Sequence, residues 1–117
     1  MTPTELTAQY DALVLPSRFE GFGLSAVEAM VAARPVLISD IAGLAPHVRN
    51  CDGGVVVEAT VDSIRAGIEQ LIARRDEWRE MGLRGRQYVL EHLNWTHIAR
   101  EALSDYRRLL NLRHARV

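Results

Sequence analysis

Three short runs of apolar residues mark the first half of the chain. They span Ala12 to Leu15, Val36 to Ser39 and Val55 to Val57. Each run is almost continuously apolar rather than alternating, as in strands that are buried on both faces of a parallel sheet. Proline or glycine lies beside each run and limits its length. A predicted helix of about Ser25 to Ala33 separates the first two runs, which completes a β-α-β unit.

From residue 61 onward, apolar positions recur at helical spacing. The pattern predicts one amphipathic helix beginning at Val61. A second helix runs from Asp76 through Val89, with Gly82 and Gly85 as candidate breaks. A third lies around residues 98–110, and its N-cap would be the asparagine or the threonine of the Asn94-Trp95-Thr96 segment. The second half of the chain is therefore predicted to be helical.

The predicted fold is a partial α/β domain. With a short helix before Ala12, whose Leu6 and Tyr10 would face inward, the pattern gives three strands and about five helices. Complete sheets have roughly four to six strands, so three are few for an independent domain with helices on both faces. We expect a Rossmann-like parallel sheet in residues 11–60 and a helical part in residues 61–117.

Composition and charge narrow the range of partners. The chain has 117 residues, of which 48% are hydrophobic and 25% charged, as in ordinary globular proteins. Fourteen basic and fifteen acidic residues leave a net charge of −1, which argues against a nucleic-acid partner. The four arginines near the end, Arg107, Arg108, Arg113 and Arg116, leave peripheral membrane contact as an alternative.

Cysteine content and hydropathy indicate the cellular compartment of the protein. The single cysteine, Cys51, has no partner for an internal disulfide, so a reducing environment is expected. No apolar run approaches the roughly 20 residues that span a bilayer, and the first residues lack the pattern of a signal peptide. We therefore expect a cytoplasmic protein.

The segment from Pro16 to Met30 carries the candidate chemistry. Gly21 and Gly23 allow the backbone to approach a ligand closely, and the loop leads into a predicted helix, whose first N–H groups and dipole favour an anion such as phosphate. Glu20 precedes the glycines, and Glu28 lies about one turn into the helix. A carboxylate can accept hydrogen bonds from two adjacent hydroxyls, as in ribose or a sugar ring. Together these features predict a nucleotide-sugar site.

Simpler interpretations of the same residues remain open. Ser25 and Glu28 match a capping box, in which the glutamate bonds the backbone N–H of the serine. Glu20 could be a solvated loop carboxylate, and the two glycines could serve only the turn. A dinucleotide-binding loop is a sharper alternative, because Gly21-x-Gly23-x-x-Ala26 and the later Asp40 satisfy its pattern. Five residues separate the first glycine from the strand, however, and Glu20 would place a negative charge beside the pyrophosphate.

A longer set of motifs resembles a known family. The segments are Leu15-Pro16-Ser17, Glu20-Gly21-Phe22-Gly23-Leu24, Glu28-Ala29-Met30, Arg34-Pro35-Val36, Ser39-Asp40 and Gly43. They resemble the C-terminal donor-binding lobe of GT-B glycosyltransferases, and specifically the retaining family 4 (group 1 glycosyl transferases), whose hallmark is two glutamates separated by seven residues. The likeness extends over almost the whole chain.

The resemblance implies a role for each matching residue. The enzyme would transfer sugar from a nucleoside diphosphate sugar to an acceptor with retention of configuration, without a metal or other cofactor, and this chain would supply donor binding. Glu20 would be the catalytic residue, positioning and stabilising the transferred sugar. Glu28 would bind the ribose hydroxyls. The remaining donor-binding residues would be Gly21, Phe22, Gly23, Leu24 and Ser25, with the last two amides at the diphosphate.

Departures from the family pattern suggest alternatives. The family usually has glycine where Ala33 stands, and often Pro-Glu where this chain has Pro46-His47. Its acceptor-binding N-terminal lobe and upstream basic residues are absent, so residues 1–117 would be a partial C-terminal nucleotide-sugar-binding domain, inactive by itself. The alternatives are a non-catalytic fragment that binds the missing lobe or another copy through an open sheet edge and, less favoured, a sugar-nucleotide epimerase or an NAD-binding domain.

Overall fold

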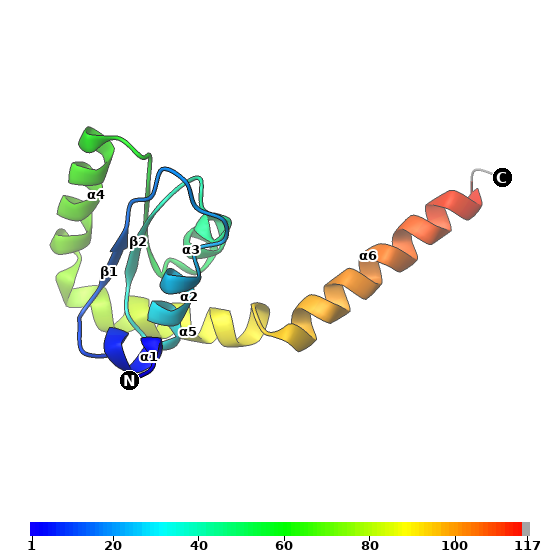
Figure 1. Ribbon diagram of the computed structural model, residues 1–117, viewed down its shortest axis with the longest axis horizontal. Helices are drawn as coiled ribbons and strands as arrows, with labels where there is room; N and C mark the ends of the chain where they lie inside the picture. Colours follow the sequence, from blue (N-terminus) through cyan, green and yellow to red (C-terminus); the bar gives the residue numbers. More distant parts are fainter. Residues whose placement is uncertain (116–117) are drawn as a thin grey trace.

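The computed structural model of the protein describes residues 1–115, apart from the side chain of Thr4, so Arg116 lies outside the described part. Its centre is a three-stranded parallel sheet in the order β1-β2-β3 (Figure 1). The strands are β1 (Leu13–Leu15), β2 (Val36–Ser39) and β3 (Gly54–Val57). The three predicted strands and their parallel arrangement are confirmed.

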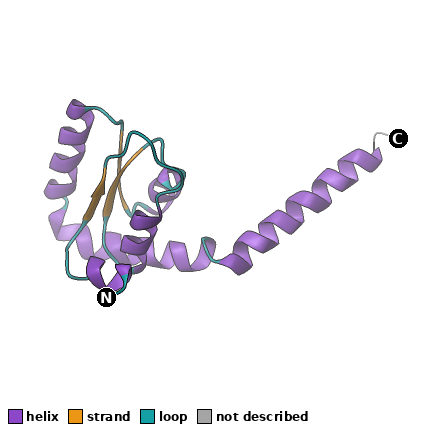
Figure 2. Cartoon of the chain, viewed as in Figure 1, coloured by secondary structure: helices purple, strands orange, loops and turns teal. Residues whose placement is uncertain are grey.

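Helices surround the sheet on both faces (Figure 2). They are α1 (Pro3–Thr7), α2 (Leu24–Val31), α3 (Ala45–Cys51), α4 (Val61–Ala73), the short 3-10 helix η1 (Arg75–Glu77), α5 (Trp78–His92) and α6 (Trp95–Ala115). Helices α2 and α3 contribute to one buried cluster with β2, and α4 contributes to a second cluster with β2 and β3. The start of α5 passes across the amino ends of the strands (Figure 1). This is the α/β arrangement expected from the sequence.

The central strand organises the core. All four residues of β2 are buried, with Val36 and Ile38 in the cluster with α2 and α3, and Leu37 in the cluster with α4. Strand β1 differs from the prediction of burial on both faces, because Val14 is 44% exposed. Within the described residues, β1 pairs only with β2. It is therefore an edge strand with one unpaired side.

Two local predictions in the N-terminal and α5 regions are wrong. The short N-terminal helix exists, but Leu6 and Tyr10 are 47% and 61% exposed rather than turned inward. Gly82 and Gly85 do not break a helix, since both are buried within α5. A Cβ on Gly82 would lie 2.0 Å from the carbonyl oxygen of Ala33. The glycines therefore allow close packing of α5 against the amino end of the sheet.

Helix α2 ends in a Schellman motif without glycine. Ala33 has φ of 58°, in the left-handed region, its N–H donates to Met30 O, and the N–H of Arg34 donates to Ala29 O. The turn into β2 is thus made by alanine in a conformation that glycine adopts more easily. Helix α3, which the apolar pattern did not predict, ends similarly at Asp52, with φ of 50°.

The last helix is separate from the core. Asn94 caps α6, because its Oδ1 accepts a hydrogen bond of 2.8 Å from the N–H of His97. It is one of the two residues that the sequence predicted as the N-cap. Helix α6 contains no buried residue among those described and projects away from the α/β body (Figure 1). Its apolar side chains, including Leu103, Leu109 and Leu110, are about half exposed.

Candidate functional site

The glycine-containing loop lies at the carboxyl ends of the strands. It leaves β1 at residue 16, enters α2 at residue 24, and is fixed to the loop that follows β2. Gly21 O accepts from Gly43 N at 2.8 Å, and Phe22 O accepts from Leu44 N at 2.9 Å. The buried Ser39 hydroxyl donates to the Ser17 carbonyl at 2.5 Å. The candidate loop is therefore held by hydrogen bonds near both of its ends.

Gly23 sets the start of α2. Its φ of 100° is left-handed, and it occupies the N-cap without a side-chain cap. The capping-box interpretation is therefore wrong, because Ser25 is the second residue of the helix rather than its cap. The amides of Ala26 and Val27 both donate to Gly23 O. Among the described residues, the amides of Leu24 and Ser25 have no backbone acceptor, and so they are available to an anion.

The two predicted carboxylates lie on either side of this helix start. Glu20 is half-buried, and the hydroxyl of Ser17 donates to its Oε2 at 3.1 Å, so it is not a freely solvated loop residue. Glu28 is half-buried in the second turn of α2. No side-chain hydrogen bond to Glu28 is formed within residues 1–115, which leaves its carboxylate free to accept hydroxyls. The structure brings the predicted residues together in one loop and helix.

An aromatic contact behind the loop was not predicted. The ring of His47 lies 5.9 Å from that of Phe22 and 5.6 Å from that of Tyr88, and its Nδ1 is 2.7 Å from the Tyr88 hydroxyl. His47 and Tyr88 thus support the loop from α3 and α5. Because they are 41 positions apart in the sequence, no local pattern could have paired them.

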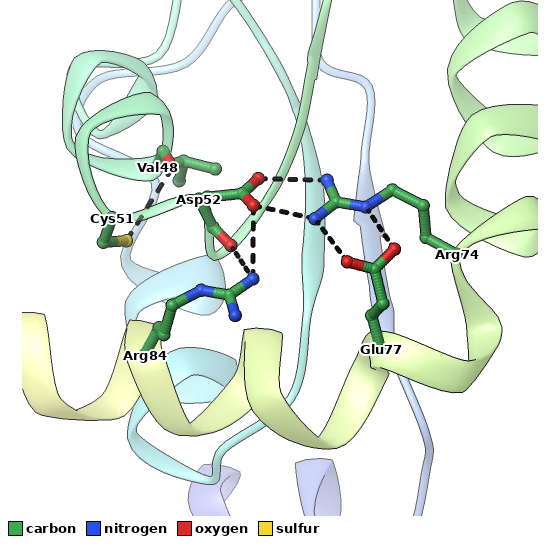
Figure 3. Close-up of polar contacts among 6 residues, drawn as sticks. All are labelled: Val48, Cys51, Asp52, Arg74, Glu77 and Arg84. Carbon is green, nitrogen blue, oxygen red and sulfur yellow. Dashed lines mark hydrogen bonds and ion pairs between the residues drawn. The ribbon is translucent and has the colours of Figure 1, made fainter.

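The opposite end of the sheet carries an ion-pair network (Figure 3). Asp52 accepts two hydrogen bonds from Arg74, at 3.0 and 2.7 Å, and a third from Arg84 at 3.2 Å. The hydrogen bonds from Arg74 lower the pKa of Asp52 below its usual range. Burial raises the pKa of the neighbouring Cys51 thiol, which disfavours its reactive thiolate. The ion pairs of Asp52 therefore connect the turn before β3 to the end of α4 and to α5 and stabilise the fold.

Other classes of site receive no support from the described residues. Residues 1–115 contain no group of three or more histidine, cysteine, aspartate or glutamate side chains that could hold a metal ion. None of the helices that the structure describes is long and apolar enough to cross a membrane. Strand β1 ends at Leu15, so Gly21 follows it only after a loop, unlike the direct strand-to-glycine turn of a dinucleotide site.

Comparison with known proteins gives the same family from sequence and from structure. Residues 2–88 match the family described as glycosyl transferases group 1. The chain is 32% identical to alpha-maltose-1-phosphate synthase of Mycolicibacterium smegmatis over 120 residues, which cover 93% of this chain and 31% of that protein. It is 34% identical to D-inositol 3-phosphate glycosyltransferase of Gordonia bronchialis over 112 residues, covering 92% of this chain and 24% of that protein.

A solved structure extends the likeness to the fold. Sucrose-phosphate synthase from Thermosynechococcus elongatus superposes with a TM-score of 0.71 and 30% identity, over 92% of this chain and 27% of that one. The chain therefore spans less than a third of the proteins that it matches. The family that the Glu20 to Met30 motif indicated is confirmed: the chain belongs to the group 1 glycosyl transferases and corresponds to a C-terminal region of their GT-B fold.

Proposed function

We propose that this chain binds the donor in a glycosyltransferase that moves a sugar from a nucleoside diphosphate sugar to an acceptor with retention of configuration. The observation that carries the proposal is the start of α2, where the amides of Leu24 and Ser25 have no backbone acceptor within the described residues. Glu20 lies just before this point and Glu28 one turn after it. An anion site between two carboxylates suits a ligand with both a diphosphate and sugar hydroxyls.

Each residue then has a distinct task. The two free amides and the helix dipole bind the diphosphate, while Glu28 accepts hydrogen bonds from the ribose hydroxyls. Glu20, oriented by Ser17, lies along the transferred sugar with the backbone of Gly21, Phe22 and Gly23. As the bond to the diphosphate breaks, Glu20 stabilises positive charge on the sugar, and the departing diphosphate assists the incoming hydroxyl. Catalysis is then mainly positioning and electrostatic stabilisation, without a metal.

The rest of the enzyme would complete this site. Residues 1–117 form a partial C-terminal nucleotide-sugar-binding domain in this proposal, with residues 11–60 as the core and 61–117 as the helical part. Its relatives are more than three times as long as the matched region. The acceptor would bind to a lobe formed outside residues 1–117, so these residues by themselves would bind donor without transferring sugar. A cytoplasmic location remains a prediction from the sequence.

Nuclear magnetic resonance of the 117-residue chain tests the diphosphate contact. A nucleoside diphosphate should shift the amide signals of Leu24 and Ser25, because both amides gain an anionic acceptor. The matching nucleoside without phosphates serves as the control and should leave these signals almost unchanged. Equal shifts with both compounds, or shifts confined to other parts of the chain, would contradict the assignment.

The role of Glu20 requires an enzyme that includes the acceptor lobe. Glu20→Ala should lower kcat by about a hundredfold, as expected when one electrostatic contact to the transition state is removed, and should change donor binding much less. Measurement of kcat and donor KM separates these effects. A variant with the kcat of the unmodified enzyme would refute the catalytic role.

A second candidate is a non-catalytic fragment that associates with the missing lobe or with another copy. It is favoured by the unpaired side of β1, where Val14 is 44% exposed, because open strand edges readily pair with other chains. Size-exclusion chromatography with light scattering tests association between copies. A monomer at all concentrations would contradict it, whereas a dimer that Val14→Lys dissociates would support it.

A further inference from the structure

An open cavity of about 350 Å³ lies at the amino ends of β1 and β2, opposite the glycine loop. Three segments line it: the residues before β1, the residues before β2, and the junction of η1 with α5. The lining residues with charged or large side chains are Asp11, Arg34, Arg75, Trp78, Arg79 and Leu83. We call this cavity the arginine pocket. Its volume is within the range of about 300–1,000 Å³ typical of small-molecule sites.

The arginine pocket has an excess of positive charge. Three arginines and one aspartate line it, in a chain whose net charge is −1. Nearby Arg74 forms ion pairs with Asp52 and Glu77, and Arg84 forms one with Asp52. By contrast, neither Arg75 nor Arg79 forms an ion pair within the part of the chain that the structure describes. The charge of the pocket is therefore free to attract an anion from solution.

Arg34 is held in place without an ion pair to any residue that the structure describes. Its Nη2 donates to the carbonyl oxygen of Ala8 at 2.6 Å, which connects the segment after α1 to the start of β2. Its Nε is buried and has no acceptor among the described residues. A carbonyl oxygen fixes the guanidinium but does not cancel its charge. A positioned guanidinium is well suited to phosphate, whose oxygens match its planar donors.

Trp78 gives the pocket an apolar wall. Its Nε1 donates to Leu71 O at 2.8 Å, which fixes the ring, and the guanidinium of Arg75 lies 5.8 Å from the ring centroid. Leu83 adds a half-exposed apolar side chain. Cations beside a fixed aromatic wall favour a ligand that has an anionic group and an apolar or ring-shaped body.

We propose that the arginine pocket binds a small phosphate ester, with the phosphate paired to the guanidinium groups and the organic part against Trp78. This site lies at the opposite end of the sheet from the donor loop, and so the proposal does not depend on the proposed function. Free phosphate can pair with the same guanidinium groups but has no organic part to contact Trp78. An ester is therefore expected to bind more tightly than free phosphate.

Tryptophan fluorescence tests this directly. The chain has two tryptophans, and Trp95 is 85% exposed on α6, so Trp95→Phe leaves Trp78 as the only tryptophan, which excitation at a wavelength that tyrosine does not absorb selects. Phenyl phosphate should change its emission saturably at constant ionic strength, with an affinity at least about threefold higher than that of inorganic phosphate. Phenol alone and sodium chloride are the reference ligands, and neither should reproduce the change.

A matched pair of charge variants assigns the response to the pocket. Arg79→Gln should weaken phenyl phosphate binding about tenfold, since a charge-assisted contact is lost. Arg107→Gln, on the projecting helix α6, should leave it unchanged. Arg75→Gln provides a second pocket variant if Arg79→Gln alters the circular dichroism spectrum. Unchanged affinity in the pocket variants, a response equal to that of phenol, or equal affinity for phosphate and phenyl phosphate would overturn the proposal.

Discussion

The two ends of the sheet are built in opposite ways. At the amino ends, α5 packs against the backbone so closely that a Cβ on Gly82 would overlap Ala33 O, and Asp52 joins two arginines. At the carboxyl ends, the loop before α2 is exposed at Gly21, where an added Cβ would meet nothing within 4 Å. The comparison teaches that the close packing of α5 and the ion pairs of Asp52 stabilise the fold at one end, while the loop at the other end leaves backbone amides and carboxylates accessible to a ligand.

A pair of glycine substitutions tests this contrast most strongly. Gly82→Ala should lower the free energy of unfolding by about 3 kcal/mol, because the added methyl would lie 2.0 Å from a backbone oxygen and α5 must move. Gly21→Ala should change it by less than about 0.5 kcal/mol, since the space around it is open. Urea denaturation followed by circular dichroism measures both. Similar losses for the two variants would remove the distinction between the ends.

The ion pairs of Asp52 provide a smaller, pH-dependent test. Asp52→Asn keeps a residue that tolerates left-handed backbone but removes the charge, and it should cost about 0.5–1 kcal/mol at neutral pH because the Asp52 side chain is 53% exposed. Since folding lowers the pKa of Asp52, this stabilisation is present above its unfolded pKa of about 3.8. It is lost as the pH falls from there through the folded pKa.

Denaturation curves between neutral pH and pH 2 measure this difference. The unmodified chain and Asp52→Asn should converge in stability at the acid end, because protonation of Asp52 removes the same charge as the substitution. A constant difference across the whole pH range would show that the ion pairs with Arg74 and Arg84 do not contribute.

The end of α2 should allow a gain in stability. Ala33→Gly should raise the free energy of unfolding by about 0.5–1 kcal/mol, because the relief of left-handed strain exceeds the entropy that glycine loses on folding. Ala32→Gly is the matched control, since its φ of −79° suits alanine, and it should lower stability by a similar amount. A loss in both variants would contradict the strain assigned to Ala33.

The sequence predicted the sheet better than the details around it. Continuous apolar runs identify buried strands because the pattern is local, and the Glu20 to Met30 motif identified the family because its residues share one loop and helix. Burial depends on elements far away in the sequence, so Val14, Leu6 and Tyr10 were assigned wrongly. The close packing of Gly82 against Ala33 was not predicted for the same reason. In the local sequence, a glycine that permits close packing looks the same as one that breaks a helix.

Donor binding is the central claim, and Glu28 tests it most directly. Calorimetric titration of UDP, GDP and ADP into the chain should identify a nucleoside diphosphate that binds, and Glu28→Gln should weaken that binding about tenfold, since charged acceptors of the ribose hydroxyls are lost. Glu69→Gln, on the exposed surface of α4, should bind like the unmodified chain, and both variants should keep its thermal stability. Equal affinity in Glu28→Gln, or no binding of any of the three, would contradict the account.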